Sequence, residues 1–313
     1  MRRKRLHRLT INVACASDAG SSPLSRVWCS GCCIFATDAA VPLGKPHASG
    51  LGRAWAFRDN ALALNPPASP KTWTKTADRP LRSARKSLGI WLFAHFVGVP
   101  VPWAAARQTD GRGLLAYEHD RLQALAAAGE RVPPVLAFDG HSLVSGDIGI
   151  TLDHWLHRTP EAQRLPLMCA AAADLAAFHA RGHWHGGAQT RNMTWDGQHF
   201  ARLDFEERLQ PGMPLATVQI YDALQLVLSL TRYLQAEGPQ AVRAVLSAYA
   251  DAPATRTQVP DLRSFLRRLL PRLQRVSRLA AWSSRLDRSR ELERLRTVLD
   301  GMAAFVQDTP PRA

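Results

Sequence analysis

The sequence HARGHWHGGAQTRNMTWDGQHFARLDFE, residues 179–206, combines a helix end, a polar loop and a hairpin, and the fold is predicted from it. The residues before it place Leu175, Phe178 and His179 at helical spacing, which predicts an amphipathic helix. Gly182 follows at the point where a left-handed C-cap would end that helix. The stretch therefore begins as a helix end that leads into a tight polar loop.

A short hairpin is predicted after this loop. Residues 193–195 and 200–203 have the composition of short strands, and the Asp196-Gly197 pair between them is a strong hairpin signal. Asn192 precedes the first strand and Asp204 follows the second. We therefore expect the hairpin to bring Asn192 and Asp204 together at the mouth of a cleft.

An amide and a carboxylate in this arrangement suit Mg²⁺ on nucleotide phosphates, because Mg²⁺ prefers hard oxygen ligands. The run from His185 to Asn192 resembles the catalytic loop H-R-D-x-x-x-x-N of the protein-kinase superfamily, and Asp204-Phe205-Glu206 resembles its D-F-G motif. The similarity is greatest to atypical bacterial members, the lipopolysaccharide-kinase-like and RIO-like branch. Gly187 stands where that family has its catalytic Asp. The alternative is an ordinary helix, turn and hairpin with an exposed Asp.

The resemblance implies two more residues of the nucleotide site. Lys75, on a strand predicted at 72–75, would contact the α- and β-phosphates, and Glu118 would pair with it from a helix. The alternatives are a solvated lysine at a strand end and a first-turn glutamate that suits the helix dipole. The spacer between Lys75 and Glu118 is longer than the usual kinase layout.

The resemblance also implies an adenine-binding hinge at Ser145 to Asp147, after a strand pair at 132–138 and 142–145 that turns at Asp139-Gly140. It leaves the chemistry without its usual base, since Gly187 has no side chain. His185 is the candidate substitute, and Gln189 could orient an acceptor hydroxyl but cannot take its proton.

The charge and the cysteine content bear on the kind of partner and on disulfide or zinc sites. The 313 residues carry a net charge of +14, and no Lys occurs after Lys86. A basic balance permits anionic partners without naming one. The five cysteines are an odd number, so they do not form a disulfide framework, and the Cys29-Ser-Gly-Cys32 pair lacks a second pair at zinc spacing.

The first fifty residues differ from the rest. They show no helical or strand period, and we interpret them as disordered or as an extension from an upstream start codon. The apolar run before Ala14-Cys15-Ala16 is too short for a signal peptide. A hairpin is predicted at 54–57 and 61–64 with its turn at Asp59-Asn60, and the resemblance implies that this turn lies over the phosphates.

Further helices are predicted along the chain. Residues 86–98 place Leu88, Trp91, Leu92, His95 and Phe96 on one face, and Pro100 and Pro102 make this segment too short to span a membrane. Residues 115–128 place Leu122, Leu125 and Ala126 on an apolar face. Asp222 is expected near the start of a helix, where it would brace the catalytic loop.

Residues 262–299 hold eleven arginines among apolar residues, interrupted at Pro271, so this segment is either a solvated basic helix or a surface for anionic membrane, with nucleic acid less favoured.

The sequence thus predicts an α+β, two-lobed protein-kinase-like fold. The small β-rich lobe would span 51–147 and the helical lobe 148–306, with an extension at 1–50 and a tail at 307–313. The expected function is binding of ATP–Mg²⁺, with phosphate transfer to a sugar, lipopolysaccharide-type or protein hydroxyl. The alternative is a pseudokinase that acts as a scaffold or regulator. The expected location is cytoplasmic, with peripheral contact at the inner membrane face.

Overall fold

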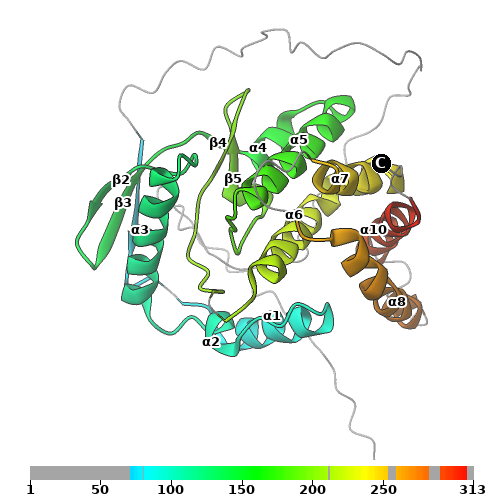
Figure 1. Ribbon diagram of the computed structural model, residues 1–313, viewed down its shortest axis with the longest axis horizontal. Coiled ribbons are helices and arrows are strands. Elements are labelled where there is room, and N and C mark those ends of the chain that lie inside the picture. The colour runs from blue at the N-terminus through cyan, green and yellow to red at the C-terminus, as the bar shows by residue number, and fades with distance from the viewer. Residues whose placement is uncertain (1–70, 80, 211, 253–258, 282–289, 309–313) are drawn as a thin grey trace, which may run out of the picture. The chain divides into compact units, whose positions relative to one another are not determined.

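The computed structural model describes residues 71–79, 81–210, 212–252, 259–281 and 290–308, all of which belong to one compact unit. Their fold is α+β, mostly helical, with two small antiparallel sheets (Figure 1). The predicted hairpin at 54–64, its Asp59-Asn60 turn and the predicted 1–50 extension lie outside the described residues.

The first sheet has the strand order β1-β3-β2. It consists of β1 (Thr72–Thr76), β2 (Val135–Phe138) and β3 (Ser142–Gly146), and β3 pairs antiparallel with both neighbours. The turn between β2 and β3 is the predicted Asp139-Gly140, where the Asp139 carboxylate accepts the backbone N–H groups of His141 and Ser142. Strand β2 begins later than predicted, because Pro133 and Pro134 cannot donate to a ladder.

Helix α3 (Gly111–Ala127) contacts all three strands of this sheet. It begins earlier than predicted, because the Asp110 carboxylate caps it by accepting the Gly113 N–H at 3.0 Å. Leu122 and Leu125 are buried as expected, whereas Ala126 is exposed. The placement of Ala126 on the apolar face was therefore wrong, and Glu118 lies on the buried face instead.

The second sheet has the order β4-β5-β6 and contains the predicted hairpin. It consists of β4 (Ile150–Thr151), β5 (Met193–Trp195) and β6 (Phe200–Arg202). The hairpin turns at Asp196-Gly197, where the Asp196 carboxylate accepts two backbone N–H groups and Gly197 adopts a φ of 102°. Both hairpins thus turn at an Asp-Gly pair whose aspartate accepts two backbone N–H groups.

The remaining elements are helical, and several of them enclose the main apolar core (Figure 1). Helix α7 contacts α5 and α10 most extensively, and α6 contacts α5, α7 and α10. The 3₁₀ turn η1 lies directly before β5. These elements are α1 (Ala84–Phe96), α2 (Trp103–Ala106), α4 (Leu152–Arg158), α5 (Glu161–Ala180), η1 (Thr190–Asn192), α6 (Leu215–Glu237), α7 (Pro239–Ala250), α8 (Leu262–Ala281) and α10 (Arg290–Gln307).

Two helix predictions need correction, and a third left open whether the helix is buried or interfacial. Helix α6 begins at Leu215, so Asp222 lies two turns inside it and not near its start. Pro271 lies within α8, which continues to Ala281 without interruption. In α1 the predicted apolar face is largely exposed, and the buried residues are Ser87 and Ala94. Among the described residues, no helix is both long and apolar enough to cross a membrane.

Candidate functional site

Lys75 lies at the centre of the candidate site. Its Nζ is 2.7 Å from Glu118 Oε1, 2.9 Å from Glu118 Oε2 and 2.6 Å from Asp204 Oδ1. The predicted pairing of Lys75 with Glu118 is therefore present. Lys75 lies on β1, where it pairs with Leu143 of the central strand β3. Glu118 lies on α3, which packs against this sheet. One ammonium group joins side chains from the sheet, the helix and the hairpin.

The charges of this cluster are strongly coupled. Burial opposes the charge on Lys75, but the carboxylates of Asp204, Glu118 and Glu206 outweigh it and raise the lysine pKa. Burial dominates at Glu118, which is 2% exposed, and raises its pKa despite Lys75. At Asp204 burial is outweighed by Lys75, which lowers the pKa. The cluster is thus built to keep Lys75 charged and Asp204 ionised.

Asp204 reaches the cluster through an uncommon backbone conformation. Its φ of 72° lies in the left-handed region, which Asp and Asn adopt more readily than other non-glycine residues. The residue before it, Leu203, donates its N–H to the carbonyl of Asn192 at 3.0 Å. This bond extends the hairpin ladder by one position, so Asn192 and Asp204 are held at the same end of the hairpin, as predicted.

Asn192 is buried and oriented. Its Nδ2 donates to the Gly187 carbonyl at 2.9 Å, which directs the other end of the amide, Oδ1, as the acceptor. Asn192 and Asp204, at the same end of the hairpin, are the amide and carboxylate that the sequence predicted for Mg²⁺. A third carboxylate is present, since single oxygens of Glu118, Asp204 and Glu206 all lie within 4.8 Å of one another.

His185 has both ring nitrogens engaged. Nε2 donates to the Leu203 carbonyl at 3.0 Å, and Nδ1 accepts the Gly187 N–H at 3.1 Å. The ring stacks on Phe205 at 4.4 Å between centroids, and burial lowers its pKa to about 4. These contacts favour a role in holding the loop against the Asp204 segment. They do not support the candidate role of His185 as a base.

Gln189 is tied to the same loop. Its Nε2 donates to Gln225 Oε1 at 2.7 Å, and Gln225 Nε2 in turn donates to the Gly186 carbonyl at 3.0 Å. Gln189 is therefore positioned by α6. Its suggested role in orienting an acceptor stays a prediction.

Gly187 occupies ordinary backbone space. A Cβ built there would lie 3.4 Å from Asn192 Nδ2 and 3.7 Å from His185 Nδ1, which is normal contact. Neighbouring Gly186 is different, because its φ is 88° and a Cβ would lie 2.8 Å from that of Glu207. The backbone thus requires glycine at 186 and accepts a side chain at 187.

Asp222 braces the loop from α6. Its carboxylate accepts the His185 N–H at 2.6 Å and the Gly186 N–H at 2.7 Å, and it is fully buried. His179 Nε2 also contacts it at 3.4 Å. The bracing role predicted for Asp222 is therefore confirmed, although it arises from the middle of a helix.

The predicted hinge lies on the sheet. Ser145 pairs with Trp73, two residues from Lys75 on β1, which corresponds to roughly 7 Å along the strand. Asp147 Oδ1 accepts the Trp73 indole N–H at 3.0 Å, and the Asp147 N–H donates to the Lys71 carbonyl at 2.9 Å. These contacts place both residues near β1, and none of them reaches the Lys75 cluster.

Sequence reasoning missed a second set of ion pairs. Arg79 pairs with Glu206, which also accepts from Gln108 Nε2 at 3.2 Å, and Arg82 pairs with Glu207. These contacts hold the segment after Asp204 against the residues that lead into α1. Adjacent glutamates after D-F were visible in the sequence, but nothing there connected them to arginines more than a hundred residues earlier.

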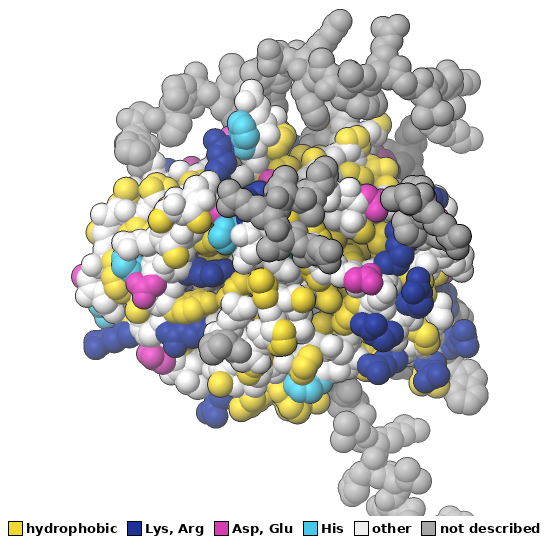
Figure 2. Space-filling view, in the orientation of Figure 1, with side chains coloured by type: hydrophobic (Ala, Val, Ile, Leu, Met, Phe, Trp, Pro, Cys, Tyr) yellow, Lys and Arg dark blue, Asp and Glu magenta, His cyan; other side chains and the backbone are white. Residues whose placement is uncertain are grey.

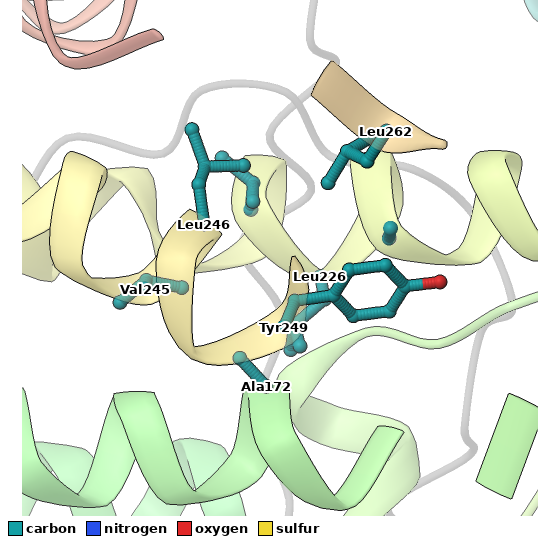
Figure 3. Close-up of a pocket in the computed structure, with 8 residues that line it drawn as sticks. Ala172, Leu226, Val245, Leu246, Tyr249 and Leu262 are labelled. Carbon is teal, nitrogen blue, oxygen red and sulfur yellow. The ribbon is translucent and has the colours of Figure 1, made fainter. Parts of the chain in front are cut away.

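A small apolar pocket in the helical part of the fold is too small for a ligand such as a nucleotide (Figure 3). It lies among α5, α6, α7 and the start of α8, and offers about 10 Å³, close to what one water molecule needs. Its lining is apolar except for the Tyr249 hydroxyl, which contacts His179 Nδ1 at 2.6 Å. The pocket is lined by Ala172, Ala223, Leu226, Val227, Val245, Leu246, Tyr249 and Leu262.

Comparison with known proteins adds little about function. No model of a known protein family matches the chain. The chain is 33% identical over 130 residues to an uncharacterized protein of Haemophilus influenzae. The match covers 41% of this chain and 48% of that protein, so it spans about half the length of the relative.

Proposed function

We propose that the chain binds a nucleoside triphosphate with Mg²⁺ at the Lys75 cluster, in the manner of the protein-kinase-like proteins whose catalytic loop it resembles. The observation that carries the proposal is the double contact of Lys75 with Glu118 and Asp204. Residues from positions 75, 118 and 204 meet there, and each matches a position that the resemblance assigns to nucleotide binding.

The residues present fit such a ligand. Lys75 would contact phosphate oxygens while Glu118 holds it in place, and Asn192 and Asp204 would hold the Mg²⁺. The ion would neutralise phosphate charge, which is its main contribution in phosphoryl transfer. The resemblance gives the base to backbone groups at Ser145 to Asp147, but the N–H groups of Gly146 and Asp147 already donate to Pro134 and Lys71, so this contact stays a prediction. The raised pKa of Lys75 and the lowered pKa of Asp204 support these roles, because both groups stay charged at neutral pH.

Transfer to an acceptor is the less supported half of the proposal. The acceptor would be a sugar hydroxyl of the lipopolysaccharide type or a protein hydroxyl. Gly187 supplies no base, and both nitrogens of His185 are engaged. General-base catalysis typically contributes about 10²–10⁴-fold. These observations favour the second candidate function, a nucleotide-binding pseudokinase that transfers phosphate slowly or serves as a scaffold.

Direct titration with a fluorescent ATP analogue tests the binding site. We expect saturable binding that requires Mg²⁺ and is lost in Lys75→Met. Lys71→Met is the matched control, because Lys71 is exposed directly before the same strand and its Nζ lies over the Trp73 ring at 5.6 Å. Equal affinity in the wild type and Lys75→Met would refute the proposed site.

A further inference from the structure

A group of large apolar side chains is exposed on α1 and α2. Leu88 is 46% exposed and Leu92 53%, and Phe96 continues the same row at a spacing of four residues. Phe93 lies next to this row, and Trp103 on α2 is 41% exposed. Gly89 adds an open surface on the same helix. We refer to Leu88, Leu92, Phe93, Phe96 and Trp103 as the apolar face.

The two segments that form this surface carry basic residues and no acidic ones. Residues 81–109 contain no Asp or Glu, while Arg85, Lys86 and Arg107 are exposed there. Helix α8 also contains no acidic residue. Its exposed arginines form a basic stripe, which consists of Arg267, Arg268, Arg272, Arg275 and Arg278.

The basic stripe lies beside the end of α1. A Cβ on Gly98, two residues after α1, would be 3.8 Å from Arg272 Nη1 and 4.0 Å from the Phe265 ring. Figure 2 shows dark blue side chains gathered at the lower right, where Figure 1 has α8, with hydrophobic side chains along the lower edge, where Figure 1 has α1 and α2. Apolar and cationic groups thus share one region of the surface.

We propose that this region docks on an anionic lipid surface, with the apolar face in the headgroup boundary and the basic stripe on lipid phosphates. An interfacial helix typically buries its apolar side about 5–10 Å deep while cationic residues meet anionic headgroups. A tryptophan at the edge of the apolar face suits the same boundary. Exposed leucines have no counterpart in a phosphodiester backbone, which distinguishes this surface from a nucleic-acid site.

Electrostatics argues against the other occupants. A second copy placed on the same region would bring one basic stripe against another, because a two-fold interface pairs a surface with itself. Residues 1–70 carry nine Lys and Arg against three Asp, so their charge also opposes docking beside the stripe. An anionic membrane is the occupant whose charge is complementary. This proposal is independent of nucleotide binding.

Vesicle flotation tests the proposal. The probes are vesicles of pure phosphatidylcholine and vesicles in which roughly 30% is replaced by phosphatidylglycerol, at about 0.1 M salt. We expect binding to the anionic vesicles only. Replacing Arg272 and Arg275 by Gln should weaken binding roughly thirtyfold, since each basic residue near an anionic surface contributes about fivefold. Replacing Leu92 and Phe96 by Ser should weaken it at least about tenfold.

Matched controls separate the face from the rest of the surface. Leu136→Ser changes a leucine that is 55% exposed on β2, and Arg112→Gln changes an exposed arginine on α3; neither should alter binding. All replaced side chains are exposed, so the thermal midpoints should stay close to that of the wild type. The proposal is overturned by absence of binding to anionic vesicles, or by loss in the arginine variant alone. It is equally overturned by a solution dimer that the Leu92 and Phe96 replacements dissociate.

Discussion

Lys75 Nζ lies 2.6 Å from Asp204 Oδ1, although the two residues are 129 positions apart in the chain. The same ammonium group holds Glu118, so one cation balances two carboxylates. A nucleotide with Mg²⁺ would compete for this arrangement, because the metal needs Asp204 and the phosphates need Lys75. The proposed ligand thus replaces an existing ion pair and does not fill an empty space.

Removing the cation should destabilise the fold. Lys75→Met leaves the buried Glu118 and the half-buried Asp204 facing each other without the ammonium group that contacts both. We expect a loss of about 1–3 kcal/mol, below the usual cost of breaking a buried pair because the Lys75 side chain is 31% exposed. Glu118→Gln keeps an acceptor for Lys75 and should cost less. Urea unfolding of both variants and of the double variant measures the coupling, and strictly additive losses would contradict it.

Introducing an aspartate at 187 should increase phosphate transfer. Gly187→Asp places a carboxylate where the catalytic loop that this chain resembles has its Asp, and a Cβ there meets only ordinary contacts. If Mg²⁺–nucleotide binds as proposed, we expect ATP hydrolysis to rise by roughly 10²–10⁴-fold. Gly186→Asp is the control and should instead lower stability by about 2 kcal/mol or more, because of its positive φ and its close contacts with Glu207 and Trp184. Equal behaviour of the two variants would disprove this account of the loop.

Asp222 should be essential to the conformation of the loop. Asp222→Ala strands two buried N–H groups, those of His185 and Gly186, at about 1–3 kcal/mol each. We expect a loss of roughly 3–5 kcal/mol in chemical unfolding and a matching loss of nucleotide affinity. The control is Asp120→Ala, whose carboxylate is 79% exposed and should matter by less than about 0.5 kcal/mol. Comparable losses in the two variants would show that the buried contacts contribute little.

His185 should make stability depend on pH. Burial lowers its pKa to about 4 from 6.5, so the unfolded chain takes up the proton first as the pH falls. The contribution of the neutral, buried His185 to the free energy of unfolding is fully present above pH 6.5. This free energy declines by up to about 3 kcal/mol toward pH 4. His185→Gln should therefore flatten the plot of unfolding free energy against pH in that window. His157→Gln, at an exposed position on α4, should leave the slope unchanged; a wild-type slope in His185→Gln would contradict the assignment.

The local elements could be predicted where the sequence carries its own signal. The Asp139-Gly140 and Asp196-Gly197 turns are self-sufficient, because each aspartate accepts backbone N–H groups within three residues. The proximity of Asn192 and Asp204 follows from the second turn alone. The pairing of Lys75 with Glu118 needed the family resemblance, since no local rule connects a strand lysine to a helix 43 residues later.

The remainder depended on tertiary packing. Asp222 was expected at a helix start, yet α6 begins at Leu215 because Pro214 and the apolar residues after it already suit a helix. The row from Leu88 to Phe96 predicted a helix with one apolar face, either buried or interfacial, because periodicity does not tell which side of a helix contacts the core. The buried side of α1 is instead the one with the short side chains of Ser87 and Ala94, which allow the helix to lie close to the core. Arg79 and Glu206 are 127 positions apart in the chain, so only the tertiary fold brings them into contact.

Thermal unfolding with ATP, with and without Mg²⁺, measures whether the Lys75 cluster binds a nucleotide. A ligand at about 100 times its Kd stabilises the fold by roughly 2.7 kcal/mol. We predict a Mg²⁺-dependent rise in the midpoint that disappears in Asp204→Asn, where asparagine tolerates the same left-handed backbone. Asp196→Asn, at the 45% exposed aspartate of the hairpin turn, should keep the full rise. No rise at saturating ATP in the wild type, or an undiminished rise in Asp204→Asn, would contradict nucleotide binding at this site.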